Sequence, residues 1–422
     1  MSQKDTDRLQ YYSRKVKSFI DMSPDTHEPR VQPSTYIRIA QLQPSASALF
    51  PSLRRLHYNL KEDSFISLSL SSFSCHRSLI HLNSSVSLAE NSKILLLGHF
   101  WQPFPLRCSA RSSFVMDICQ WTLLKKLYFK ELRSLELSDI IFVGSHISWE
   151  VLGALPSLEN LTLKDVYSSS HPVRAAENSN SQSGGRKYFE ALESLSVSGS
   201  FSFIQHLLGL IDSPWLKSIN IYPNINRNEH IHEHLFAPST AIVASRWSQS
   251  LKTLVIDTRS ADGNALASSK SLMLLTDLHE IQRFDLHRCR MENMDDDVRR
   301  LVMPWPKLTH LSLLPLNQSY IFLSTLRIIA ESCPELFFLR IPLDASTFPP
   351  FDTSSKRLCH SLELLNLGGV SPPNASLECQ IQAALHLDSI FPSVFVEAHH
   401  QDATWSGIRD LLGLCQEARR VY

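Results

Sequence analysis

The stretch CPELFFLRI, residues 333–341, decides the fold. It places a Cys-Pro pair directly ahead of Leu336, Leu339 and Ile341, which are spaced three and two residues apart. Proline lacks a backbone N–H and disfavours helical angles in the residue before it, so a helix should end at this pair. The two-residue step from Leu339 to Ile341 is the period of a β-strand. The stretch therefore predicts the end of a helix followed at once by a strand.

The same apolar-x-x-apolar-x-apolar pattern recurs along most of the chain. Copies begin at Leu132, Leu158, Leu192, Leu216, Leu251, Ile281, Leu308, Leu336 and Leu362, at intervals of 24 to 35 residues. One copy means little in a leucine-rich chain, but nine copies in order indicate a structural repeat. Weaker copies begin at Leu53 and Leu79. A copy at Leu124 lies only eight residues before Leu132, so the two cannot be strands of separate repeats, and the register before residue 132 stays open.

The segments between the copies have helical periodicity. In residues 323–336, the apolar side chains of Leu323, Leu326, Ile329 and Cys333 recur at the spacing of one helix face. Each unit is then strand, loop, helix and loop, and no unit can bury its leucines alone. The pattern predicts an α/β solenoid with parallel strands on the concave face and helices on the convex face.

This pattern resembles leucine-rich repeats, and the unit length is similar to the longer, cysteine-containing variety. In that variety a cysteine follows the strand and Cys-Pro ends the helix, as Cys289 and Cys333 do here. Three stretches resemble segments of fungal F-box/leucine-rich-repeat proteins: RLQYYSRKVKSFIDMSP (8–24), LFPSLRRLHYNL (49–60) and LPSLENLTLKDV (155–166). The resemblance implies a 1–48 segment like the region after an F-box and a leucine-rich-repeat domain over 49–422. We find no F-box itself, and we expect polar loop insertions near 168–187 and 223–247.

Composition excludes several classes of protein. Lys+Arg and Asp+Glu both number 41, which removes the usual electrostatic argument for nucleic acid or a membrane surface. Only 12 glycines are present, and neither a phosphate-binding G-x-x-x-x-G-K-[ST] loop nor a dinucleotide-binding G-x-G-x-x-G occurs. There is no secretory signal, no apolar run of membrane-spanning length and no C-x-x-C pair among the 8 cysteines. We expect an intracellular protein, cytoplasmic or nuclear, with reduced and packed cysteines.

Two clusters invite a chemical interpretation. His230, His232 and His234 alternate, so an extended backbone would project three imidazoles to one side. They lie in the longest interval between repeats and match no metal motif, so we expect no metal and no cofactor. Asp295 and Asp296 precede Arg299 and Arg300 by four residues, which favours ion pairs on a solvated helix face over catalysis. We expect no catalytic residue.

The concave face carries the candidate binding residues. Side chains between the buried leucines point to it. In the strands from 281 to 342 they are Arg283, Asp285, His287, His310, Phe338 and Arg340. Arginine and aromatic residues are enriched in interaction hot spots. We predict that these six residues bind a protein partner, with no nucleic-acid or membrane partner.

These observations lead to three hypotheses for function. The first is a non-catalytic interaction scaffold; the F-box resemblance implies substrate recognition for a cullin-type ubiquitin ligase, with a Skp-type adaptor as partner only if an F-box exists upstream. The second is a stand-alone repeat protein without a ubiquitin role. The third is an enzyme with an unrecognised site, which requires a deep pocket that a shallow solenoid face rarely offers.

Overall fold

The computed structural model describes part of the chain. It describes residue 11, the strands at 18–20, 55–61 and 81–87, and the segments 132–138, 141–142, 152–168, 188–224, 236–258, 267–316, 319–344, 357–358, 360–367, 376–397 and 403–421. The chain divides into two compact units. The first comprises Met1–Phe203 with Leu210–Trp215, and the second comprises Ile204–Gly209 with Leu216–Tyr422.

The first unit is built on parallel strands. They pair in the order β1 (Ser18–Ile20), β2 (Arg55–Lys61), β3 (His81–Ser87), β4 (Ser134–Ser138), β6 (Asn160–Ser168) and β7 (Ser194–Gly199). The short β5 (Ile141–Phe142) pairs with β6. Strand β4 belongs to the copy that begins at Leu132, which resolves the choice that the sequence left open; residues 124–129 lie outside the described part. Within the range 1–48, the described strand β1 pairs with β2 in this sheet.

The second unit continues the same architecture. Its strands β8 (Ser218–Pro223), β9 (Thr253–Asp257), β10 (Arg283–His287), β11 (His310–Leu314), β13 (Phe338–Arg340), β15 (Leu364–Asn366) and β16 (Phe395–Glu397) pair in parallel in that order. A separate two-stranded parallel pair joins β12 (Ile321–Phe322) to β14 (Leu343–Asp344).

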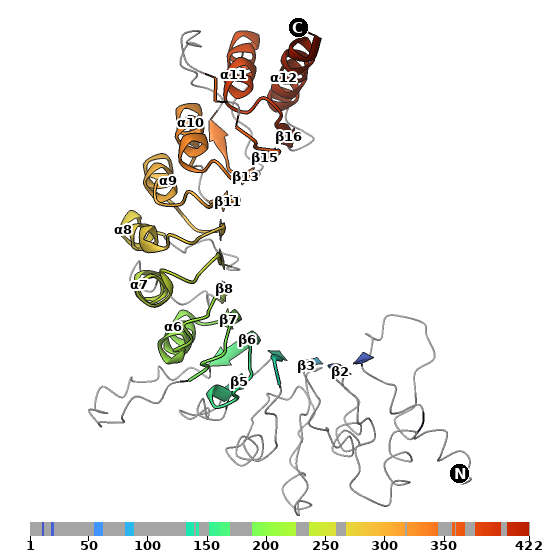
Figure 1. Ribbon diagram of the computed structural model, residues 1–422, viewed down its shortest axis with the longest axis vertical. Helices are drawn as coiled ribbons and strands as arrows, with labels where there is room; N and C mark the ends of the chain where they lie inside the picture. Colours follow the sequence, from blue (N-terminus) through green and yellow to red (C-terminus); the bar gives the residue numbers. More distant parts are fainter. Residues whose placement is uncertain are drawn as a thin grey trace, which may run out of the picture. The chain divides into compact units, whose positions relative to one another are not determined.

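The second unit also contains helices, which follow its strands along the chain. They are α7 (Phe236–Trp247), α8 (Ser269–Met273), the 3-10 helix η2 (Leu274–Asp277), α9 (Met294–Val302), α10 (Leu323–Ser332), α11 (Leu377–Ile390) and α12 (Ala403–Val421). Figure 1 shows helices α7 to α11 in a row on one side of the strands, which are seen edge-on. Helix α6 (Phe201–Leu210) contains residues of both units.

Part of the range 223–247, which we expected to be a polar loop insertion, is helix α7. The helix forms because Phe236, Val243 and Trp247 lie on one face and are all buried. The range therefore supplies the helix of a repeat unit as well as a connection.

The repeated apolar residues form the core. In the copies from Leu158 to Leu362, all three apolar residues are at most 4% exposed, and Leu132 and Leu135 of the preceding copy are 2% and 5% exposed. Equivalent residues are Cα partners in adjacent strands, such as Leu311 with Leu339. The parallel strands, the helices that connect most successive strands of the second unit and this buried ladder confirm the predicted α/β leucine-rich-repeat fold.

The Cys-Pro motif ends a helix as predicted. Helix α10 stops at Ser332, and the backbone N–H of Cys333 donates to the carbonyl of Ile329 at 2.9 Å. Cys333 and Cys289 are both buried, and burial raises the pKa of each thiol to about 12. Each Sγ lies 3.7 Å from a backbone carbonyl, Val302 for Cys333 and His287 for Cys289. These thiols are packed, uncharged side chains of the repeat.

Candidate partner-binding surface

The strand register of the second unit sets out a surface in two rows. We call the side of β10, β11, β13, β15 and β16 that points away from the buried ladder the strand face. Its first row of Cα partners is Arg283, His310, Phe338, Leu364 and Phe395, and its second row is Asp285, Ser312, Arg340, Asn366 and Glu397. The residues between the rows, such as Phe284 and Leu339, are buried beneath it. Because of the repeat spacing, residues about 28 positions apart in sequence lie next to each other on adjacent strands.

A buried carboxylate ties the first strands of this face together. Asp285 is 2% exposed, although its strand position alone predicts a solvated side chain. Arg283 donates from Nε and Nη2 to Asp285 Oδ2 at 2.9 and 2.7 Å. The Nε2 atom of His310, on the neighbouring strand, lies 3.4 Å from Asp285 Oδ1. Two larger side chains thus lie against Asp285, and Arg283 is held in place by it, whereas Asp285 Oδ1 accepts no hydrogen bond from His310.

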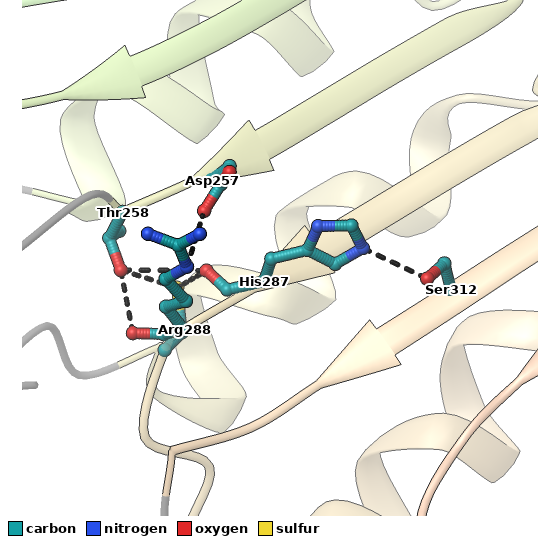
Figure 2. Close-up of polar contacts among 6 residues, drawn as sticks. Asp257, Thr258, His287, Arg288 and Ser312 are labelled. Carbon is teal, nitrogen blue, oxygen red and sulfur yellow. Dashed lines mark hydrogen bonds and ion pairs between the residues drawn. The ribbon is translucent and has the colours of Figure 1, made fainter. Parts of the chain in front are cut away.

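A second set of contacts lies at the carboxyl end of β10, shown in Figure 2. His287 Nε2 lies 2.9 Å from Ser312 Oγ on the next strand. Arg288 Nε lies 3.4 Å from Asp257 Oδ1 on the preceding strand, and Thr258 Oγ1 donates to the Arg288 carbonyl at 2.6 Å. Arg288 has a φ of 60°, a left-handed conformation that is uncommon outside glycine. These contacts hold the turn after β10 against its neighbours.

An aromatic stack continues the first row. The rings of His310 and Phe338 are parallel, with centroids 4.0 Å apart and an angle of 3° between their planes. Phe337 lies edge-on to His310 at 6.4 Å and is 47% exposed. The stack places flat apolar surface beside the charged groups around Asp285.

Arg340 differs from the other arginines of the face. Its Nε is buried and has no hydrogen-bond partner, and no carboxylate in the described segments forms an ion pair with it. The side chain is half-buried. It therefore contributes an uncompensated positive charge, whereas Arg283 and Arg288 are paired with Asp285 and Asp257.

Burial sets the protonation of the two histidines. It lowers the pKa of His287 against the opposing effects of Asp285 and Asp257, and Arg340 and Arg288 lower this pKa further. Burial likewise lowers the pKa of His310 and outweighs the carboxylate of Asp285. Both imidazoles are therefore neutral at pH 7 and act there as hydrogen-bonding and stacking groups.

The structure brings the six predicted residues together. Arg283, Asp285 and His310 share direct contacts, Phe338 stacks on His310, and His287 bonds to Ser312, which lies in register with both Asp285 and Arg340. Whether they bind a partner stays a prediction.

Sequence reasoning missed the end of this surface. Phe395 is 61% exposed on β16 and lies in register with Leu364. Phe391, Val394 and Val396 are buried and match the apolar spacing, but Val396 pairs with Leu365, the second and not the third apolar residue of the preceding copy. The spacing alone would therefore have given the wrong register for β16.

Other candidates have different outcomes. The triad His230, His232 and His234 lies outside the described residues, as does nearly all of the polar run 168–187. Of the two expected ion pairs, the one between Asp295 and Arg299 is present at 2.7 Å, whereas Asp296 and Arg300, both within the described residues, form none. Asp295 Oδ1 also accepts from the Phe322 backbone N–H at 2.8 Å and from Thr325 Oγ1 at 2.6 Å, so it joins α9 to the start of α10.

Two kinds of feature are absent from the described part of the chain. It holds no group of three or more His, Cys, Asp or Glu residues arranged to bind a metal ion. None of its helices is long and apolar enough to cross a lipid bilayer.

The pair of His287 and Ser312 has the hydrogen bond of a base and a nucleophile, which bears on the enzyme hypothesis. Ser312, however, is only 3% exposed. A nucleophile must also have oxyanion donors directed at the point of attack and room for a substrate carbonyl. The buried hydroxyl supports a structural role, in which Ser312 positions the His287 ring.

Comparisons with known proteins identify no relative by sequence. No protein-family model matches the chain, and no curated protein matches it. Solved structures with a similar fold include the complex of Rad7 and Elc1 from yeast, with 14% identity and a TM-score of 0.37 over 83% of this chain and 78% of that chain. An internalin, InlF from Listeria monocytogenes, has 12% identity and a TM-score of 0.37 over 94% of this chain and 86% of that one.

A third similar structure is the complex of Latrophilin 3, Unc5D and the leucine-rich-repeat protein FLRT2. It has 17% identity and a TM-score of 0.35 over 64% of this chain and 70% of that chain. At such values, the fold of this chain rests on its own strand register and buried leucines.

Proposed function

We propose that this chain is a non-catalytic protein-interaction scaffold and that the strand face of its second unit binds a protein partner. The observation that supports the proposal most is the cluster around Asp285. A buried carboxylate is bonded to Arg283 and lies 3.4 Å from the ring of His310, which stacks on Phe338. Because these side chains are already ordered, binding would cost little further side-chain entropy.

The chemistry of the face fits a protein better than a small molecule. Over β10, β11 and β13 the face combines two arginines and a stacked histidine and phenylalanine with one carboxylate, Asp285, which is paired with Arg283. Interfaces between proteins use such residues as anchors, surrounded by neutral contacts that exclude water. A rigid repeat sheet offers these anchors at fixed positions over several strands.

The test is affinity capture from a lysate of the source cells with the purified chain and two variants. One variant carries Phe338→Ala with Arg340→Glu on the strand face. The control carries Arg420→Glu, which reverses an exposed charge on helix α12. Circular dichroism establishes that all three proteins are folded.

We expect at least one protein that the native chain and the control retain and the strand-face variant loses. In that complex, amide hydrogen exchange should slow in β10, β11 and β13. Proteins retained equally by all three chains, or protection confined to the helices, would contradict the proposal.

A role in ubiquitin transfer is a narrower proposal that rests on the sequence resemblance alone. It predicts that the chain, or a version extended upstream in its gene, co-purifies with a Skp-type adaptor. Without that association, the stand-alone scaffold remains as the function.

A further inference from the structure

We infer that the strand face binds a protein segment that places a carboxylate against Arg340 and apolar side chains along Phe338, Leu364 and Phe395. This inference rests on the proposed function and adds the chemistry of the partner. It follows from the charges that remain unpaired on the face and from the position of its exposed apolar residues.

The apolar part of the surface crosses three strands. Phe338 in β13, Leu364 in β15 and Phe395 in β16 are consecutive Cα partners. Adjacent strands are about 4.8 Å apart, so this apolar row is about 10 Å long. Phe338 and Leu364 are half-buried and Phe395 is mostly exposed. Two turns of an amphipathic helix, at 5.4 Å for each turn, or a short extended segment would cover a row of that length.

The charged part of the surface has one free cation within the described segments. Arg283 is neutralised by Asp285 and Arg288 by Asp257, whereas Arg340 has neither an ion pair nor a partner for its buried Nε. A half-buried guanidinium attracts a carboxylate more strongly than a fully solvated one, because less water screens the charges. The fork of donors on arginine also suits two carboxylate oxygens.

The second row gives the bound segment a direction. Arg340, Asn366 and Glu397 are consecutive Cα partners, and Asn366 Nδ2 donates to Glu397 Oε2. A carboxylate of the partner is attracted at β13 and repelled at β16. The segment should therefore carry its acid over β13 and a neutral or basic residue over β16.

Single-stranded nucleic acid is the competing occupant, because aromatic and arginine side chains also stack on bases. Binding of a phosphate backbone requires a continuous positive groove. This face instead carries Asp285 and Glu397 beside its arginines, Asp257 lies on the neighbouring strand β9, and the whole chain is formally neutral. A segment with one acid and several apolar residues matches this surface, whereas a chain of phosphates does not.

The experiment is selection of a phage-displayed library of random 16-residue peptides on the folded full-length chain. Selected peptides are synthesised with a fluorescent label and their affinities measured by anisotropy. The measurements use the native chain, Arg340→Glu, Phe395→Ser and two controls on the helix side, Arg420→Glu and Leu377→Ser. Leu377 is 66% exposed on α11 and so matches Phe395 in exposure. A labelled 15-nucleotide poly(U) strand is measured in parallel.

We expect enriched peptides that combine Asp or Glu with Leu, Phe or similar residues. Arg340→Glu and Phe395→Ser should each weaken their binding at least tenfold, and the two controls should change it less than twofold. Replacing the peptide acid with lysine should restore binding to Arg340→Glu, which a purely structural effect of the substitution cannot produce.

The opposite results separate this inference from the broader proposal. Peptides that need Phe395 but carry no acid, and that bind Arg340→Glu unchanged, would overturn the inference and leave the strand face as a protein-binding surface. Binding of poly(U) that Arg340→Glu abolishes would also overturn it. Peptides that bind every variant equally, or no enrichment at all, would count against both.

Discussion

Replacing Leu339 with alanine tests the packing on which the whole fold depends. Leu339 is fully buried, and its Cα partners in the neighbouring strands are Leu311 and Leu365. The substitution removes three carbons, which corresponds to about 2.4 kcal/mol of transfer free energy at about 0.8 kcal/mol for each carbon. The cavity that remains between rigid strands adds to this loss, so we expect a total of about 3–4 kcal/mol.

The adjacent residue provides a matched control. Arg340 lies on the opposite side of the same strand, is half-buried and makes no hydrogen bond through Nε. Arg340→Ala should therefore change the free energy of unfolding by less than about 0.5 kcal/mol. The two substitutions are adjacent in sequence, but Leu339 points into the buried core and Arg340 points to the strand face.

Urea denaturation followed by tryptophan fluorescence measures the difference. Trp247, Trp305 and Trp405 are all buried in the second unit and report its unfolding. With a slope of about 2–3 kcal/mol per molar urea, Leu339→Ala should lower the midpoint by about 1–2 M. Because repeat proteins can unfold in parts, hydrogen exchange in residues 336–341 should confirm that the loss is local. Equal midpoints for the two variants would refute the assigned strand register.

Three further predictions concern contacts between repeats. His360 is buried; its Nδ1 accepts from the Leu362 backbone N–H at 3.0 Å, and its Nε2 then donates to a backbone carbonyl at 2.8 Å. His360→Ala should therefore lower the free energy of unfolding by about 2–4 kcal/mol in urea denaturation, and a loss below about 0.5 kcal/mol would contradict these bonds. Asp295→Ala should lower the free energy of unfolding by about 1–3 kcal/mol because it removes the hydrogen bonds to the start of α10. Asp296→Ala, for which no such contact is described, should change this free energy little, and equal effects of the two substitutions would refute the role of Asp295 in joining α9 to α10. Partial burial lowers the pKa of His287, so the unfolded chain binds this proton first, and stability should fall as the pH drops from about 6.5 towards the lowered pKa. Replacing His287 with glutamine should flatten part of that loss in urea titrations at pH 7.5 and 5.5, and an unchanged pH profile would exclude its contribution.

The strands and their order were predictable because contacts in a repeat fold are local. Each apolar copy pairs with the next one along the chain, so periodicity alone aligns Leu311 with Leu339 and Leu339 with Leu365. The helix end at Cys333 followed from the chemistry of proline. Prediction failed where residue type departed from the leucine pattern, as at Val396 in β16.

The arrangement of the strand face was only partly predictable. Alternation along β10 correctly placed Arg283, Asp285 and His287 on one side of the strand. It could not show that Asp285 is buried, because the groups that cover it include His310, 25 residues later in sequence. Neither could it show which arginine would keep a free charge.

The amino-acid sequence by itself determined the repeat, the direction of the strands and the side of each strand that is buried, because these depend on the spacing of apolar residues. Only the tertiary structure decided that Arg283 is neutralised while Arg340 is not, and that Phe395 extends the apolar row begun by Phe338. Such pairings depend on side-chain reach and on burial between neighbouring strands, and these are set only when the repeats stack.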